Sequence, residues 1–318
     1  MKRKTKNLPI PTAENQIKNN SYLYHTKHKW TLWKMGMIIK TLIVLICIVL
    51  SITACSNIPK SNDFVVHFID VGQADSILVQ GPSINILIDA GNNEDGDQVI
   101  SYLKHVGVQK LDYVIGTHPH EDHIGGMDQV IHSFAIGTII MPKTTHTTHT
   151  YEDVLDAIVT KGLKIQTAVS GTVYQRGDVW MTILAPNKTI YKDLNNTSVV
   201  VKINYKKTAF IFQGDAEIES EKEILAKGYD ITASIIKLGH HGSSSSTSKE
   251  YLHKVNPQVA VISVGRNNDY KHPNDSTMKL LKEEGIPVFR TDESGTIVFT
   301  SNGNSISCNK QPGSYTSP

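Results

Sequence analysis

Thr117-His118-Pro119-His120-Glu121-Asp122-His123 is the stretch that decides the fold of this chain. It places histidines and a carboxylate in the order HxHxDH, after an apolar run and before a Gly-Gly pair. Because side chains of an extended chain repeat every two residues, His118 and His120 point the same way and can hold one metal ion. Asp122 and His123 come where the chain turns into a helix, and they can reach a second ion. Imidazole and carboxylate donors suit Zn, Mn or Fe, so the stretch predicts a metal site at a strand end.

The composition is that of a globular protein with an unusual front end. Of 318 residues, 39% are hydrophobic and 19% are charged. Residues 1–40 contain nine Lys or Arg and one acid, Glu14, and so carry a net charge of +8. Taking this from the +2 of the whole chain leaves −6 for residues 41–318. A mildly acidic remainder without a run of Lys and Arg does not favour tight binding to nucleic acid.

The hydrophobic segment near the N-terminus predicts a bacterial lipoprotein signal. Its apolar core, residues 42–50, is shorter than the about 20 residues that span a bilayer, and positive charges precede it. The segment ends in Ile52-Thr53-Ala54-Cys55, which resembles a lipobox. We therefore expect Cys55 to be lipidated and to anchor the protein at the outer face of the cell membrane. The alternative is an uncleaved membrane helix.

This interpretation divides the chain into five parts. They are a basic extension (1–34) that a start at Met35 or Met37 would omit, the signal peptide (35–54), the lipidated cysteine with a tether (55–62), a folded domain (63–302) and a frayed polar tail (303–318). The three cysteines, Cys47, Cys55 and Cys308, offer no disulfide framework, so the core must stabilise the domain.

Strands and helices alternate within the domain. Apolar runs such as 63–69 and 209–213 predict strands, and the apolar spacing over 97–106 and 124–134 predicts helices. A series of strands followed by helices occurs twice, which predicts two sheets packed face to face with helices outside.

Asp215 is a candidate metal ligand from the second half. It follows the hydrophobic strand 209–213 and Gly214, at the kind of strand end where ligands gather. An Asp after Gly is commonly a plain turn residue, but a two-metal site needs an anionic bridge. The HxHxDH stretch therefore favours a ligand role for Asp215.

Two further strand ends carry histidines. His240 and His241 follow the apolar run 235–238, and the serine-rich loop after them, with Ser243 and Ser244, can donate hydrogen bonds to a phosphate oxygen. His272 follows another strand, beside a basic residue and an Asn, and can contact substrate or protonate a leaving group.

Motif by motif, residues 63–300 resemble the metallo-β-lactamase superfamily, and within it the hydrolase domain of ComEC-type competence DNA-uptake proteins. The matching segments are HFIDVGQADSILVQ (67–80), ILIDAG (86–91), THPHEDHIGG (117–126), NNTSVVVKI (195–203), FIFQGDAE (210–217), LGHHGSSSSTS (238–248) and VISVGRNNDYKHP (261–273). The resemblance implies an α/β fold, an αββα sandwich of two mixed β-sheets, with the metal site at one edge.

The resemblance also implies a site with two divalent metal ions, Zn or Mn. Its ligands would be His118, His120, Asp122, His123, Asp215 and one histidine of the 240–241 pair, with His240 taken as the ligand. Asp89 would hold the site in shape. Catalytic roles are expected for Asp122, His241, His272 and Asp89, and substrate contacts for Asn196, Ser243 and Ser244.

The sequence departs from the family pattern in two respects. The many membrane helices of the ComEC channel are absent, so this chain is not expected to be the DNA translocator. Most superfamily members also carry another ligand histidine before the bridging Asp, where this chain reads Asn195-Asn196-Thr197-Ser198. One metal position is therefore expected to be weaker, or to favour Mn over Zn, unless His146 or His149 folds in from a Thr-rich loop.

Three functions are compatible with these features. The first is a surface-anchored, metal-dependent phosphodiesterase or nuclease that acts through a metal-bound hydroxide, with single-stranded DNA as one expected substrate. The second is a hydrolase of a cell-envelope phosphoester, such as a phosphorylcholine esterase, or of a lactone or thioester. The third is a non-catalytic envelope binding protein with a structural metal.

Overall fold

The computed structural model describes residues 63–317, and the segments expected before residue 63, Cys55 included, lie outside this range. Two sheets make up the domain. The first has the order β15-β14-β1-β2-β3-β4-β5-β6 and is antiparallel from β15 to β3 and parallel from β3 to β6. Its strands are β1 (Phe64–Phe68), β2 (Ile77–Gly81), β3 (Ile84–Ile88), β4 (Lys110–Ile115), β5 (Ala135–Met141), β6 (Ile165–Thr167), β14 (Ile297–Ser301) and β15 (Ile306–Cys308).

The second sheet has the order β13-β12-β11-β10-β9-β8-β7. It is parallel from β13 to β10 and antiparallel from β10 to β7. Its strands are β7 (Val173–Arg176), β8 (Val179–Ala185), β9 (Val200–Tyr205), β10 (Thr208–Phe212), β11 (Ile235–Lys237), β12 (Val259–Ile262) and β13 (Val288–Arg290).

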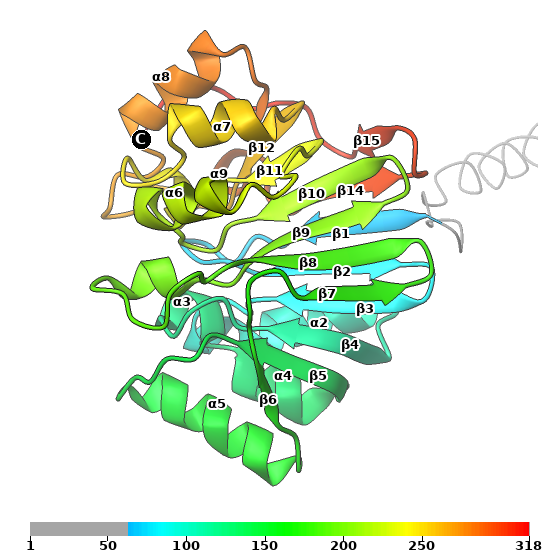
Figure 1. The fold of residues 1–318 in the computed structure, drawn as a ribbon. Helices are drawn as coiled ribbons and strands as arrows, with labels where there is room; N and C mark the ends of the chain where they lie inside the picture. The colour runs from blue at the N-terminus through cyan, green and yellow to red at the C-terminus, as the bar shows by residue number, and fades with distance from the viewer. Residues whose placement is uncertain (1–62, 318) are drawn as a thin grey trace, which may run out of the picture. The chain divides into compact units, whose positions relative to one another are not determined.

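Helices cover the outer faces of both sheets (Figure 1). Apolar residues of α2, α4 and α5 pack on the first sheet, and those of α6, α7 and α8 pack on the second. The helices are α2 (Gly96–His105), α3 (Glu121–Ile124), α4 (Met127–Ser133), α5 (His149–Thr160), α6 (Ile218–Lys227), α7 (Lys249–Val255), α8 (Asp275–Glu283) and α9 (Thr291–Ser294), with the 3-10 turns η1 (Asn93–Asp95), η2 (Leu194–Thr197) and η3 (His240–Gly242). None of the helices in residues 63–317 is long and apolar enough to cross a membrane.

The core follows from the two-residue period of the strands. In β1, Phe64 and Phe68 point between the sheets, where they meet Phe210 and Phe212 of β10. The alternate residue Ile211 points to the other face, under the helices. The predicted α/β architecture, two mixed sheets face to face with helices outside, is confirmed.

The helix predicted over 124–134 is divided between α3 and α4, and the backbone makes a close approach to another loop at the division. A Cβ on Gly125 would lie 2.2 Å from the carbonyl carbon of Asn92, so only glycine allows α3 to lie against the loop after β3. The chain changes direction there, and α4 begins at Met127.

The tail predicted to be frayed from residue 303 is instead part of the domain, so that prediction was wrong. β15 pairs with β14, and further on Gly313 donates its N–H to Val288 while Tyr315 donates its hydroxyl to the carbonyl of Ile286. The polar tail is ordered because its backbone completes the edges of both sheets.

Candidate metal centre

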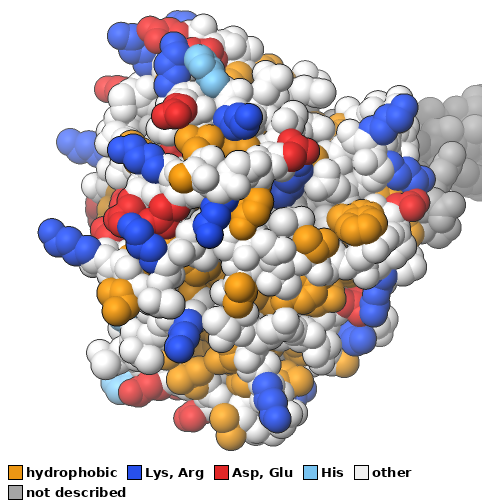
Figure 2. All heavy atoms as spheres, in the orientation of Figure 1, with side chains coloured by type: hydrophobic (Ala, Val, Ile, Leu, Met, Phe, Trp, Pro, Cys, Tyr) orange, Lys and Arg blue, Asp and Glu red, His pale blue; other side chains and the backbone are white. Residues whose placement is uncertain are grey.

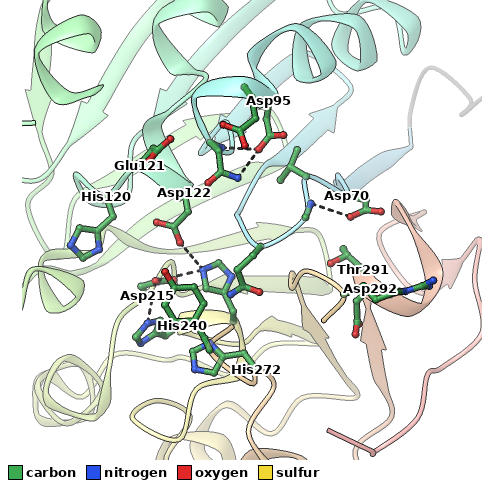
Figure 3. Close-up of a pocket in the computed structure, with 18 of the residues that line it drawn as sticks. Asp70, Asp95, His120, Glu121, Asp122, Asp215, His240, His272, Thr291 and Asp292 are labelled. Carbon is green, nitrogen blue, oxygen red and sulfur yellow. Dashed lines mark hydrogen bonds and ion pairs between the residues drawn. The ribbon is translucent and has the colours of Figure 1, made fainter. Parts of the chain in front are cut away.

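The predicted site residues lie on loops that leave the carboxyl ends of strands in both sheets. Asp89 follows β3, the HxHxDH stretch follows β4, Asp215 follows β10, and His240 and His241 follow β11. These loops surround a pocket of about 1220 Å³ (Figure 3). Its wall includes His120, Asp122, Asp215, His240, His241 and His272.

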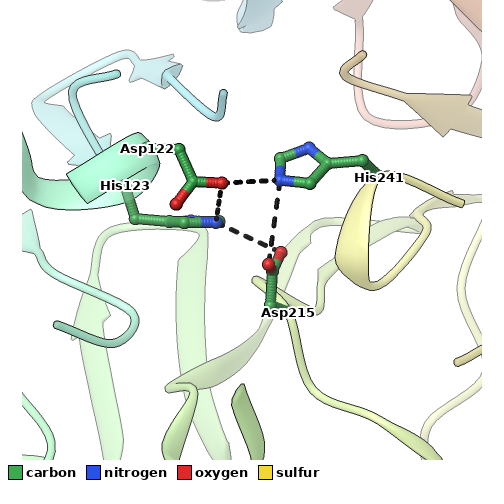
Figure 4. Close-up of side chains that lie close together, drawn as sticks. All are labelled: Asp122, His123, Asp215 and His241. Carbon is green, nitrogen blue, oxygen red and sulfur yellow. Dashed lines mark hydrogen bonds and ion pairs between the residues drawn. The ribbon is translucent and has the colours of Figure 1, made fainter. Parts of the chain in front are cut away.

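Four of these residues form a compact cluster, shown in Figure 4: Asp122, His123, Asp215 and His241. One potential ligand atom from each lies within 4.8 Å of all the others. His123 Nε2 is 3.2 Å from Asp215 Oδ1, and His241 Nε2 is 3.1 Å from Asp122 Oδ2 and 3.7 Å from Asp215 Oδ2. Two carboxylates and two imidazoles are a donor set suited to a divalent transition metal.

The second nitrogen of each imidazole is held by a neighbour. His123 Nδ1 is 2.8 Å from Asp89 Oδ2, and Asp89 also accepts hydrogen bonds from the N–H and hydroxyl of Thr117. His241 Nδ1 donates to the carbonyl of Ser263 at 2.9 Å. With Nδ1 protonated in both rings, each Nε2 presents its lone pair to the cluster. This is how metal-binding histidines are usually oriented.

Two atoms of the cluster are buried and have no hydrogen-bond partner in residues 63–317. They are His123 Nε2 and Asp215 Oδ1, which face one another. A buried polar atom without a partner costs free energy, and a shared cation would satisfy both. The residues present therefore fit a divalent metal ion.

The pKa values of the four cluster residues are shifted because their ionisable groups are buried close to one another. Burial opposes ionisation of Asp122 and Asp215, but the neighbouring imidazoles outweigh it and hold the pKa of both carboxyl groups below the ordinary value. Burial likewise opposes protonation of His123 and His241, yet the carboxylates raise the pKa of both rings. The cluster thus attracts positive charge, which protons or a cation can supply, and metal binding would release the protons.

His118 and His120 form a second group of donors beside this cluster. His118 Nε2 lies 3.0 Å from His120 Nδ1 and 3.9 Å from Asp215 Oδ2. Burial lowers the pKa of both rings, which keeps them neutral as metal ligands must be. Asp215 therefore lies between two groups of donors.

The two neighbouring histidines of η3 have different positions, which the sequence left open. His241 belongs to the four-residue cluster, so its position is that of a candidate ligand, and the catalytic role expected for it stays a prediction. His240, taken as the ligand, lies at the edge: its Nε2 is 3.8 Å from Asp215, and its Nδ1 faces Glu217 and Ser245. Both residues have left-handed backbone, with φ of 49° and 51°, which turns their side chains apart.

Asn195, and not Asn196, faces the pocket at the position of the missing histidine. Its amide is 3.5 Å from His240 Nδ1, and its Oδ1 is buried without a partner among the described residues. Asn196 is buried against the start of α6, where it accepts hydrogen bonds from the backbone N–H groups of Glu217 and Ser220 and donates to the Glu217 carboxylate. The position of Asn196 therefore does not support the substrate contact expected of it.

The serine-rich loop does not form part of the pocket wall. Ser243 is buried and bonds to Ser245, and Ser244 is exposed away from the lining. The prediction that Ser243 and Ser244 contact substrate is thus not supported by their positions. The Thr-rich loop reaches the site only through His146, whose ring meets the His120 ring edge to face at a centroid distance of 6.3 Å, whereas His149 is fully exposed.

His272 does lie in the pocket wall, with its ring 5.4 Å from that of His240. Burial and the two nearby histidines lower its pKa to about 4, so it is neutral at neutral pH. Its Nδ1 is buried without a partner in the described part of the chain.

Two charged residues behind the cluster, Asp75 and Lys237, were not among the predicted site residues. They form a fully buried ion pair, and Lys237 also donates to the carbonyl of Gly214 at 3.1 Å, next to Asp215. Asp75 Oδ1 in turn lies 3.7 Å from His241 Nδ1. The available signal was a lysine inside the apolar strand β11, which ordinary strand composition does not explain.

This fold and this donor cluster define a metal-dependent hydrolase, and the chain belongs to the metallo-β-lactamase superfamily, whose family model matches residues 69–266. Among curated proteins it is 33% identical over 257 residues to ComE operon protein 3 of Bacillus subtilis and 28% identical over 240 residues to Competence protein ComA of Neisseria gonorrhoeae. Each alignment covers 75% of this chain, but only 33% and 32% of the respective relatives. The chain thus spans about a third of the length of these competence proteins.

Solved structures agree on the fold. The metallo-β-lactamase fold protein YhfI from Bacillus subtilis aligns with a TM-score of 0.52 and 15% identity over 75% of this chain and 100% of that one. Igni18, a metallo hydrolase from Ignicoccus hospitalis, gives a TM-score of 0.50 and 18% identity over 74% of this chain and 98% of that one.

Proposed function

We propose that this protein is a binuclear metal-dependent phosphodiesterase that acts on nucleic acid outside the cell. The observation that carries the proposal is the position of Asp215 between two groups of nitrogen donors, His118 with His120 and His123 with His241. A carboxylate in that position can serve two cations at once. The similarity to competence proteins supports nucleic acid as the substrate.

The residues would hold two divalent ions, Zn or Mn. Asp122, His123, Asp215 and His241 supply one set of four donor residues, whereas His118, His120 and Asp215 supply only three, and Asn195 faces the pocket where most superfamily members have a further histidine. When bound, such ions lower the pKa of a coordinated water and polarise a phosphoryl oxygen. The set completed by an amide oxygen favours Mn over Zn.

The chain's own polar groups fit a phosphodiester at this centre. His272 is neutral at neutral pH, so it can donate a hydrogen bond to a substrate oxygen more readily than it can supply a proton. The Asn195 amide and His240 lie on the same side of the pocket and can orient a second oxygen. Asp89 acts indirectly, because it holds His123 and Thr117 in place.

The surface predicts transient binding of nucleic acid. Figure 2 shows Lys and Arg scattered singly among acidic residues on one face of the described domain, with no continuous basic stripe there. This agrees with the net charge of −6 after residue 40. Weak, salt-sensitive binding suits an enzyme that degrades or trims a passing strand.

Hydrolysis of a cell-envelope phosphoester is the second candidate function, because the pocket is open, polar and large enough for a small ester. Anchoring through a lipid on Cys55 would place either activity at the outer face of the membrane. This part of the proposal rests on the lipobox-like sequence Ile52-Thr53-Ala54-Cys55.

The experiment is a hydrolysis assay on the full-length chain in detergent, with Mn or Zn added after removal of metal. The substrates are bis-p-nitrophenyl phosphate, single-stranded DNA and p-nitrophenyl phosphorylcholine. Metal-dependent cleavage of the first two supports the proposal. Cleavage of phosphorylcholine ester alone would favour the second function, and metal binding without hydrolysis of any of the three would favour a binding protein.

A further inference from the structure

The wall of the pocket formed by residues 263–273, between β12 and α8, is a preformed surface. Asn268 ties the loop together: its amide donates to the carbonyls of Gly265 and His272, and its side-chain oxygen accepts the N–H of His272. The loop therefore holds its shape without a ligand, and the side chains on it have fixed positions relative to the metal centre.

A series of aromatic rings runs along this wall. Tyr270 stacks on His272, with ring centroids 5.8 Å apart and an interplanar angle of 24°. His272 meets His240 edge to face at 5.4 Å, and Figure 3 shows these two rings next to one another near Asp215. Tyr270 itself is 70% exposed. The ring of Tyr270 is thus exposed to solvent at the pocket, at the end of a row of rings that leads through His272 and His240 to the metal centre.

Arg266 provides a fixed positive charge on the same wall. Its Nε and Nη2 donate to the backbone carbonyl of Asp292 at 3.1 and 2.7 Å, while the Asp292 carboxylate is taken up by Arg290. Nη1 of Arg266 has no hydrogen-bond partner within residues 63–317. A guanidinium fixed in this way can offer its free donors to a phosphate.

Asp70 lies on the side of Arg266, close to Gly295, but three other acidic lining residues, Glu94, Asp95 and Glu121, lie together near η1 and the start of α3. An anionic chain that reaches the metal centre is repelled there and is attracted on the side of Arg266. The uneven charge of the pocket lining therefore favours the aromatic wall, which carries Arg266, as the path of a polyanion.

We propose that Tyr270 and Arg266 form a nucleotide subsite, in which the base next to the cleaved phosphodiester stacks on Tyr270 and an adjoining phosphate contacts Arg266. The inference rests on the proposed phosphodiesterase function and adds to it the two side chains that would hold the base and the adjoining phosphate of the substrate. Stacking of a base on an aromatic side chain is typically sequence-tolerant, so the subsite does not select among bases.

The test compares two substrates that differ in the nucleoside alone: thymidine 5′-(p-nitrophenyl phosphate) and methyl p-nitrophenyl phosphate. The quantity measured is the ratio of their kcat/KM values with the metal-loaded full-length chain. Tyr270→Leu should lower this ratio roughly 5- to 100-fold, the worth of one stacked base. Tyr270→Phe, which keeps the ring, should restore it. Trp180→Leu, a change of another half-exposed aromatic on β8, is the matched control and should not alter the ratio.

An equal loss on both substrates would mean a merely structural effect of Tyr270, and an unchanged ratio would mean no stacking; either result overturns the subsite. If the wild type cleaves neither substrate, the proposed function is wrong. The subsite can then still be tested by measuring ligand binding with calorimetry. Wild type should bind thymidine 5′-monophosphate more tightly than 2-deoxyribose 5-phosphate, and Tyr270→Leu should remove the difference. Equal affinities in the wild type would refute the inference.

Discussion

Removal of the buried lysine behind the metal centre should destabilise the domain far more than removal of a surface lysine. Lys237 is 0% exposed and its partner Asp75 is 1% exposed, so water screens neither charge. In Lys237→Met the Asp75 carboxylate would remain buried without its ion-pair partner, leaving only the imidazoles of His123 and His241 nearby, at 3.8 and 3.7 Å, and its Oδ1 already lacks a hydrogen-bond partner among the described residues. Breaking a buried pair in this way costs about 3–5 kcal/mol of unfolding free energy.

A double variant separates the cost of leaving one buried charge unpaired from the contribution of the ion pair to the free energy of unfolding. Lys237→Met combined with Asp75→Asn leaves no unpaired charge, so it should be more stable than Lys237→Met alone. Lys279→Met is the matched control: Lys279 is 76% exposed and lies 3.8 Å from Glu283, and its loss should cost less than about 1 kcal/mol.

The assay is urea unfolding of the metal-free protein followed by far-UV circular dichroism, with the free energy extrapolated to water. Metal content after reconstitution is measured alongside, because Lys237 also holds the carbonyl of Gly214 next to Asp215. A loss below about 1 kcal/mol in Lys237→Met, equal to that of the control, would refute the reasoning.

Three further predictions follow from single residues. Burial holds the pKa of His67 at about 4, below its ordinary 6.5, so the native state binds fewer protons than the unfolded state between these pH values. The free energy of unfolding should therefore fall by on the order of 3 kcal/mol as the pH drops from 6.5 to 4. His67→Asn should flatten this pH dependence in urea titrations, and an unchanged slope would count against the prediction. Asn195→His should supply the missing imidazole and slow the loss of zinc during dialysis against a chelator, whereas the same change at Asn196 should disturb α6 and leave zinc retention unimproved. Cys55→Ser should release the protein from membranes or leave an unprocessed precursor, and mass spectrometry of the wild type should find lipid on residue 55; a wild-type protein without lipid would contradict this.

Most of the fold and much of the site could be predicted from local patterns in the sequence. The HxHxDH stretch after an apolar strand, the carboxylate after β10 and the histidines after β11 could be placed together because strand ends gather at one edge of each sheet. The alternation in β1 and β10 made the two-sided core predictable.

What failed depends on contacts that no local pattern contains. Asp75 and Lys237 are 162 positions apart, so their pairing has no local signal. Asn195 and Asn196 differ by one step in the 3-10 turn η2, and that step decides which of them faces the pocket. The edge strands β7 and β15 are short and at most partly buried, and their pairing partners, rather than their composition, make them strands.

We infer that Asp215 holds divalent metal together with His118, His123 and His241. Elemental analysis after reconstitution with excess Mn and removal of free ion tests this most directly, on wild type, Asp215→Asn and the exposed control Asp178→Asn. We expect two Mn per chain in wild type and in the control, and less than one in Asp215→Asn while its circular dichroism is unchanged. Equal metal content in Asp215→Asn and wild type would contradict it.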